Sequence, residues 1–158
     1  MIPQKQVYGD IAAGLPGMKA GQNSYNYWPN TPLAEGDVAI GTFVWPGTDP
    51  VAQATNAGEE DAEPIGLVER NIVYINMDVT AQGSDLAPEG STLTVATQGA
   101  YWVVSATAAT VGQKVFAVSA DGTIKTGAAG ATVTGAVETP WVVTTPGDIG
   151  EPIIITRA

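Results

Sequence analysis

The sequence has 158 residues and a mass of 16.2 kDa, which is the size of one ordinary domain. It contains neither cysteine nor histidine, which excludes disulfides, Cys/His zinc sites, cysteine nucleophiles and histidine general bases. Six basic residues against 16 acidic ones give a formal net charge of -10, which argues against a surface that attracts nucleic acid or an anionic membrane.

Charge and hydropathy also limit how the chain can associate. Residues 20–113 hold 11 acidic residues and a single basic one, Arg70, whereas the rest of the chain holds five of each. Because like charges repel, we expect copies of the chain to meet through other surfaces. No apolar run approaches 18 residues, and the first residues lack the apolar stretch of a signal peptide, so we expect a protein that is used without export.

The residue composition predicts an all-β fold. Val, Ile and Thr together supply 46 residues, whereas Leu, Met, Glu, Gln, Lys and Arg together supply 29. β-branched side chains suit a pleated strand better than a helix. The 19 Gly and 11 Pro residues interrupt the chain about every 8 to 12 residues, a spacing typical of a β-sandwich or β-barrel.

The first 35 residues show no sustained alternation of apolar and polar side chains. We predict an extended N-terminal arm over residues 1–35, followed by a single β domain over residues 36–158. Two interpretations of the arm stay open: a loosely packed terminus that lies over its own domain, or an arm that anchors on a neighbouring molecule. In the second interpretation the predicted contacts with the neighbour are Tyr8, Ile11, Leu15, Tyr25, Tyr27 and Trp28.

Alternation and turn residues predict strands along the rest of the chain. The segment Val38–Trp45 alternates in a way that covers both of its faces. Asp121-Gly122 lies between two apolar runs and is the strongest short hairpin signal in the sequence. In chain order, the predicted strands are Val38–Trp45, Val51–Thr55, Ile65–Val68, Ile72–Val79, Thr92–Thr97, Tyr101–Ser105, Lys114–Val118, Thr132–Glu138, Trp141–Thr144 and Pro152–Thr156.

A weak internal repeat relates residues 36–71 to residues 112–140. Each predicted copy enters a strand after a Gly-polar turn and crosses a loop of small residues. It then returns through a Gly to an apolar pair and a Glu, as in Ile65–Glu69 and Thr134–Glu138. The offset between the copies falls from 76 to 69 residues, which fits loops of unequal length.

The pattern of these strands resembles that of the bacteriophage capsid decoration, or cement, proteins. In the first half the resemblance rests on Glu35–Val38, Val51–Thr55 and the return through Pro64–Glu69. In the second half it rests on Val111–Phe116 and on the apolar C-terminal strand at Ile153–Ile155. The arm also resembles the arms of these proteins, so the resemblance spans most of the chain.

The resemblance implies an all-β, compact β-barrel, β-tulip or sandwich with an extended N-terminal arm. It implies a structural virion protein that binds the outer surface of an expanded phage capsid and stabilises it. The implied partners are a major capsid protein and the chain itself, as a homotrimer, with no nucleic acid, membrane, metal or cofactor. No catalytic residue carries over, so we expect no enzyme. The implied location is the outer face of the virion, after synthesis in the host cytoplasm.

Two other binding functions compete with this interpretation. The acidic run Glu59–Glu63 offers carboxylates to Ca²⁺, but calcium loops alternate their ligands with glycines, so a solvated loop is favoured. A carbohydrate-binding β-sandwich on a virion or cell surface is the alternative function. Trp45, Trp102 and Trp141 adjoin apolar strands and are expected in the core, whereas Trp28 is predicted to be a glycan contact or an arm anchor.

Overall fold

The computed structural model describes residues 14–21, 24–71 and 85–158, and it confirms the all-β class. No helix occurs in these three ranges. The strands are β1 (Asn26–Tyr27), β2 (Leu33–Ala34), β3 (Val38–Ala39), β4 (Phe43–Pro46), β5 (Gln53–Thr55), β6 (Gly66–Val68), β7 (Leu86–Ala87), β8 (Val95–Val104), β9 (Lys114–Val118), β10 (Ile124–Gly127), β11 (Ala136–Val143) and β12 (Pro152–Arg157).

Ten of the strands form one sheet whose path does not close into a barrel. Its order is β10-β9-β11-β12-β8-β6-β4-β5-β2, with β1 paired to β8 beside this path, and β3 and β7 form a separate pair. All pairings in the large sheet are antiparallel except that between β2 and β5. The free side of β10 is covered by the chain after β8, where Ser105 forms a bridge with Ile124.

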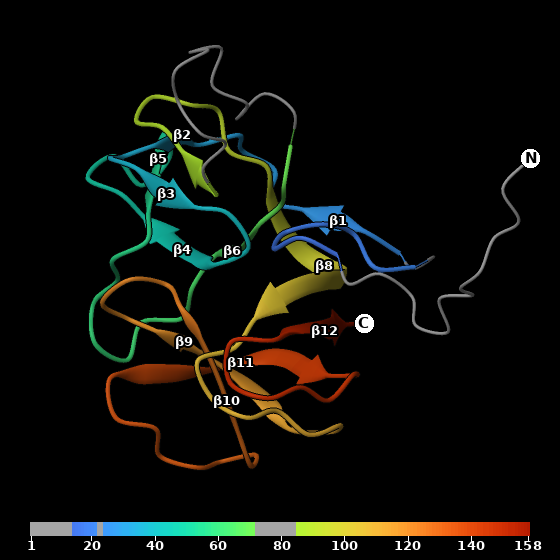
Figure 1. Cartoon of the computed structure of the whole chain (residues 1–158). Helices are drawn as coiled ribbons and strands as arrows, with labels where there is room; N and C mark the ends of the chain where they lie inside the picture. Colours follow the sequence, from blue (N-terminus) through green and yellow to red (C-terminus); the bar gives the residue numbers. More distant parts are fainter. Residues whose placement is uncertain (1–13, 22–23, 72–84) are drawn as a thin grey trace, which may run out of the picture.

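The long strand β8 joins the two halves of the molecule (Figure 1). Its first residues pair with β6 and β1, and the stretch from Gly99 to Val104 pairs with β12. In the view of Figure 1, β2 to β5 lie to the upper left of this strand and β9 to β12 lie in the lower part of the molecule. Each half has its own core, because the buried apolar side chains divide into two clusters.

The strands where the halves meet are buried on both faces. In β4, Phe43 and Trp45 belong to the cluster of the second half, whereas Val44 belongs to that of the first half. Leu67 and Val68 of β6 divide in the same way. This arrangement confirms the prediction that alternating side chains around β4 are covered on both sides, because successive side chains of a strand point to opposite faces.

Several predicted strand boundaries differ from the observed ones, and two of the differences lie at single glycines. Val38–Trp45 is divided into β3 and β4 by a turn at Gly41, whose φ of 76° lies in the left-handed region that glycine tolerates. In contrast, the two segments predicted on either side of Gly99 form one strand, β8, that continues through this residue. Elsewhere, the segments predicted as Thr132–Glu138 and Trp141–Thr144 form one strand, β11. The predicted strand Ile72–Val79 lies outside the described residues.

The predicted hairpin at Asp121-Gly122 is confirmed. It joins β9 and β10, whose register pairs Ala117 with Ile124. Gly122 has a φ of 72°, and its carbonyl oxygen accepts a hydrogen bond of 2.9 Å from the N–H of Phe43. The turn therefore also ties the second half of the chain to β4.

The two segments of the predicted repeat contain the same arrangement of three strands. In the first, β4 lies between β5 and β6, and in the second, β9 lies between β10 and β11, with antiparallel pairing throughout. The repeat itself stays a prediction, as do the domain boundaries.

No helix in the part of the chain described here is long and apolar enough to cross a membrane.

Candidate functional site

The six residues predicted to contact a neighbour differ in their accessibility. Tyr8 and Ile11 lie outside the described residues. Leu15 and Tyr27 are exposed, with 56% and 39% of their surface accessible. These two side chains are therefore available to a partner molecule.

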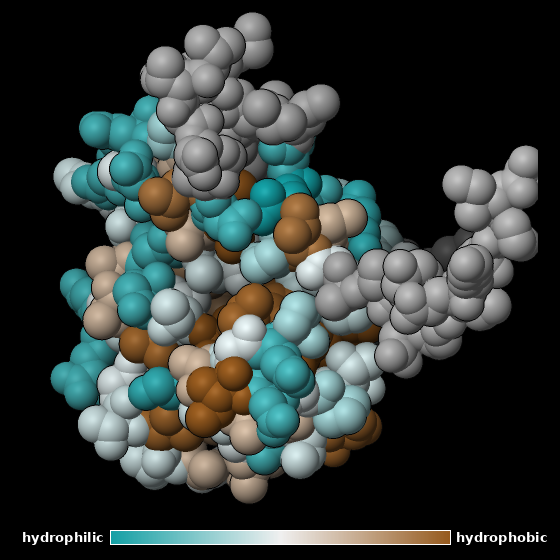
Figure 2. Space-filling model, viewed as in Figure 1, coloured by the Kyte–Doolittle hydropathy of each residue, from teal (hydrophilic) through white to brown (hydrophobic). Residues whose placement is uncertain are grey.

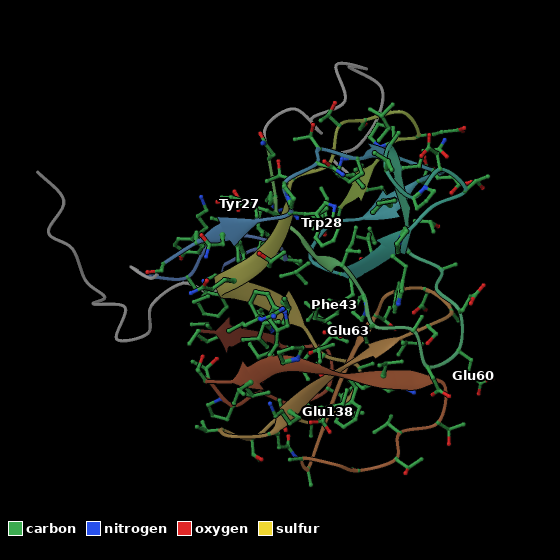
Figure 3. All side chains as sticks on the ribbon, turned by 180° about the vertical axis from the view of Figure 1, so that it is seen from behind. Tyr27, Trp28, Phe43, Glu60, Glu63 and Glu138 are labelled. Carbon is green, nitrogen blue, oxygen red and sulfur yellow. The ribbon has the colours of Figure 1, made fainter. Side chains whose placement is uncertain are left out.

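Tyr25 and Trp28 are half-buried against their own domain. Tyr25 packs on the core cluster of the second half, and Trp28 packs on that of the first half. The backbone N–H of Trp28 donates a 2.8 Å hydrogen bond to the carbonyl oxygen of Val95 in β8. Figure 3 shows Tyr27 and Trp28 at β1, beside β8.

The described part of the leading segment runs along β8 and is bonded to it. Gly17 donates to the carbonyl of Trp102, Trp102 donates to that of Met18, and Ala20 donates to that of Ala100, each over 2.8 Å. These bonds satisfy backbone donors and acceptors of a segment that has no regular strand geometry of its own. Residues 17–20 therefore lie over their own domain.

Arg70 adds a second clamp on this segment. Its backbone N–H donates to the carbonyl of Gly17 over 2.8 Å, and its Nε donates to the carbonyl of Pro16 over 2.9 Å. The guanidinium also pairs with the carboxylate of Asp85. The single basic residue of the acidic part of the chain thus holds Pro16 and Gly17 against the domain.

A cluster of charged and aromatic side chains forms where this segment crosses β8, which we call the Lys19 cluster. Lys19 Nζ lies 3.4 Å from Glu69 Oε1, and 4.9 Å and 5.5 Å from the ring centroids of Tyr25 and Tyr27. The hydroxyl of Tyr101 donates a 2.7 Å hydrogen bond to Glu69 Oε2. One carboxylate thus binds an ammonium group and a phenol, while two rings face the ammonium group.

Aromatic rings connect this cluster to the core. The rings of Tyr25 and Tyr101 meet edge-on at 5.5 Å, Tyr101 meets Trp141 at 6.0 Å, and Trp141 meets Phe43 at 6.4 Å. Such edge-to-face pairs stabilise by about 0.5–1.5 kcal/mol each beyond the burial of their area. The position of Tyr25 is therefore set by the core of the second half.

The surroundings of the Lys19 cluster favour the protonated forms of its members. Hydrogen bonding to Tyr27 is the main cause that raises the pKa of Lys19; burial opposes it, and the nearby charge of Glu69 adds to the rise. Burial raises the pKa of Tyr25. Burial, followed by the hydrogen bond and the charge of Glu69, raises the pKa of Tyr101 strongly. Lys19 is thus held as a cation and both tyrosines as neutral phenols.

This arrangement suits binding rather than chemistry. Glu69 is already bonded to Lys19 and Tyr101, so its oxygens are engaged by the protein itself. The accessible parts of the cluster are the ring of Tyr27 and the Lys19 side chain, which is 45% exposed. An aromatic ring beside a cation offers apolar area and hydrogen-bond donors to a protein surface.

The acidic run lies elsewhere, in a loop over the indole of Trp45. Its four carboxylate side chains, those of Glu59, Glu60, Asp61 and Glu63, are exposed. Trp45 Nε1 donates a 2.7 Å hydrogen bond to the carbonyl of Ala62, which fixes the loop on the core. Among the described residues, no group of three or more acidic side chains converges in a way that would hold a metal ion. In Figure 3, Glu60 lies at the edge of the molecule away from Tyr27.

Sequence reasoning missed three members of the Lys19 cluster, namely Lys19, Glu69 and Tyr101. Lys19 is separated from its partners Glu69 and Tyr101 by about 50 and 80 residues of chain, so no local spacing connects them. The one sequence signal that could have indicated Tyr101 was the alternation along β8. Because successive side chains of a strand point to opposite faces, Tyr101 is expected on the opposite face from Trp102. That pattern places Tyr101 beneath the surface but does not identify its partner.

Comparisons with known proteins agree with the fold. A family model described as XM1 gp53 minor capsid protein matches residues 4–157. Among solved structures, a chain from the structure titled "The capsid of Myoviridae Phage XM1" superposes with a TM-score of 0.60 at 16% sequence identity. The alignment covers 99% of this chain and 97% of that chain, and at this identity it shows a shared fold. No curated protein sequence matches the chain.

Proposed function

The chain belongs to the XM1 gp53 minor capsid protein family and is a structural protein of a phage virion, and from this premise we propose that it decorates and stabilises the capsid. In this proposal it binds the outer surface of an expanded capsid after synthesis in the host cytoplasm. It acts without catalysis, and its partners are the major capsid protein and two further copies of itself. The family match over nearly the whole chain is the observation that carries the proposal.

The composition of the exposed contacts supports this function. Leu15 and Tyr27 offer accessible apolar area on a segment that β8 and Arg70 hold in place. A contact residue on a pre-ordered segment loses little conformational entropy on binding, which favours affinity. Tyr8 and Ile11 extend the same proposed contact toward the N-terminus.

Mass action accounts for stabilisation of a shell by such a protein. A ligand that binds the assembled lattice but not the free or unfolded subunits stabilises the lattice, by about 2.7 kcal/mol per site at a concentration of 100 Kd. Many identical contacts over a shell, joined by contacts between copies, raise the effective concentration of each. A net charge of -10 on the outer face also discourages particles from adhering to one another.

Sedimentation with purified capsids tests the proposal. The protein is mixed with expanded and with unexpanded capsids that lack it, and the pellets are analysed. We expect the protein to pellet with the expanded form alone and to raise its melting temperature. Absence from both pellets contradicts the proposal.

Variants of the same experiment test the predicted contacts. We expect removal of residues 1–13, or Tyr27→Ala, to weaken binding to expanded capsids by at least about tenfold, because truncated contact residues dominate interfaces. Val51→Ala is the matched control, since Val51 is 68% exposed but lies in a loop away from this segment. Undiminished binding of both variants shows that the segment is not the contact.

A glycan-binding function gives a different result. Trp28→Ala then abolishes binding to a glycan array and leaves attachment to capsids unchanged. On the proposed function, the same substitution weakens attachment to capsids, since it removes the side chain that packs β1 on the core.

A further inference from the structure

A pocket of about 410 Å³ lies between the loop with the acidic run and the loop that joins β10 to β11. Glu60 and Asp61 of the first loop line it, together with Ser119, which follows β9, and Glu138 of β11. Figure 3 shows Glu60 and Glu138 in the lower half of the view, with Tyr27 above them. No basic residue is among the described residues that line this pocket. The lining thus carries three negative charges and no positive one.

The wall of this pocket includes a hydroxyl group that lacks a partner. Ser119 is 9% exposed, and its Oγ atom is buried without a hydrogen bond to any described residue. A buried hydroxyl that is left unpaired costs free energy, so its presence indicates a partner that the fold itself does not supply. Because Ser119 lines the pocket, a ligand bound there can supply that partner.

The backbone of Ser119 also ties together the two loops that border the pocket. Its N–H donates a 3.0 Å hydrogen bond to the carbonyl of Gly135, and its carbonyl accepts a 2.8 Å bond from the N–H of Gly58. On the other side, the N–H of Gly130 donates a 2.7 Å bond to Glu138 Oε2. The pocket is therefore formed before a ligand binds, which reduces the conformational entropy lost on binding.

The composition of the lining restricts the chemistry of the ligand. Among the described residues, no three acidic side chains converge as metal ligands do, so the carboxylates suit a cation that is larger than a metal ion. In Figure 2 the surface over β2 to β5 is mostly hydrophilic, and larger hydrophobic patches appear over β9 to β12. The pocket combines both characters, because it also has apolar lining residues, namely Phe116, Val133, Ala136 and Val137. An arginine side chain has the matching parts, an apolar stem and a planar cation with five N–H donors.

We propose that this pocket binds an arginine side chain of the major capsid protein. The guanidinium group donates to the carboxylates of Glu60 and Asp61 and to Ser119 Oγ, while the stem packs on the apolar lining. Arginine is enriched at protein interfaces, and complementary charge favours the correct partner. The chain itself has two arginines, and Arg70 is engaged by the carbonyl of Pro16 and by Asp85, so another protein is the expected source.

This inference rests on the proposed function for the identity of the partner. It adds a second contact with the capsid, distinct from the exposed side chains of Leu15 and Tyr27. The first contact is apolar and aromatic, whereas the second depends on opposite charges. The two contacts can therefore be tested with separate variants.

Titration with N-acetyl-arginine amide, followed by the NMR signals of the Ser119 backbone, tests the pocket directly. We expect saturable shifts with this probe and none with N-acetyl-citrulline amide, which has a similar shape without the charge. The double variant Glu60→Gln/Asp61→Asn should weaken binding by at least about fivefold, because neutral groups replace charged hydrogen-bond acceptors. Glu59→Gln/Glu63→Gln is the matched control, since it removes the same charge from the same loop at residues that do not line the pocket.

Ser119→Ala separates binding from stability. Removal of an unpaired hydroxyl relieves a cost in the free protein, so we expect an equal or higher melting temperature and binding of the arginine probe that is weaker by at least about twofold. A hydroxyl with a purely structural role gives the reverse result, a lower melting temperature and unchanged binding. The fold tolerates Asp61→Asn, because Asn, like Asp, adopts the φ of 64° found at this position.

Sedimentation with expanded capsids tests the identity of the partner. We expect Glu60→Gln/Asp61→Asn to bind capsids at least about fivefold more weakly than the control Glu59→Gln/Glu63→Gln, because it removes charges from the contact itself. If the two variants pellet equally, or if the citrulline probe binds as well as the arginine probe, the inference is wrong while the proposed function stands. A native chain that binds the arginine probe but pellets with no capsid refutes the proposed function, and with it the capsid protein as the source of the arginine.

Discussion

Gly99 is the residue of β8 against which the ring of Tyr25 packs. It lies within β8 with a φ of 133°, and a Cβ atom there would collide with the ring of Tyr25. We predict that Gly99→Ala lowers the free energy of unfolding by about 2 kcal/mol or more, from backbone strain and displacement of the ring. Urea denaturation measures this. Gly112→Ala is the control, because Gly112 also has a positive φ but faces open space, so its cost is limited to about 1 kcal/mol.

The Lys19 cluster predicts the behaviour of the protein in alkali. The folded state raises the pKa values of Tyr101, Tyr25 and Lys19 above their ordinary values of 10.0, 10.0 and 10.5. A raised pKa contributes stability that is complete below the unfolded pKa and is lost as the pH rises. We therefore expect the melting temperature to fall as the pH increases above about 10. Tyr101→Phe removes the most strongly shifted group and should flatten this fall. An unchanged slope in this variant contradicts the assignment.

At the scale of single elements, the loop with the acidic run depends on β4. The indole Nε1 of Trp45 donates a side-chain hydrogen bond to the loop backbone, at the carbonyl of Ala62. We predict that Trp45→Phe lowers stability by about 1–3 kcal/mol and speeds cleavage by a glutamate-specific protease at Glu59 and Glu60. Trp102→Phe is the control for a general loss of stability, since Trp102 contacts the leading segment instead. Equal cleavage of both variants contradicts a specific link between β4 and the loop.

At the scale of the whole molecule, the net charge of -10 opposes every contact between copies. Salt screens this repulsion, with a Debye length of about 10 Å at 0.1 M and about 3 Å at 1 M. We therefore predict that self-association strengthens as the salt concentration rises, which sedimentation velocity at several ionic strengths measures. Association that weakens with salt contradicts this prediction and indicates a contact formed by opposite charges.

The sequence by itself determined the local features of the fold. The excess of β-branched residues predicted the all-β class, and Asp121-Gly122 predicted the hairpin, because backbone preferences act within a few residues. The burial of Trp45 and Trp141 followed from their apolar neighbours. The same argument was wrong for Trp102, which is half-buried and lies outside both core clusters. Short strands such as β1 and β2 were missed because two residues carry no measurable alternation.

Only the tertiary structure decided which distant segments meet. The single strand β8 pairs with β1, β6 and β12, and this pairing brings Lys19, Glu69 and Tyr101 together. An apolar pocket likewise takes its lining residues Pro16, Val104 and Ile149 from separate parts of the chain. Strand alternation specifies which face of a strand is buried but not which strand it adjoins. The partner is selected by the packing of the complete core, a property of all of its residues together.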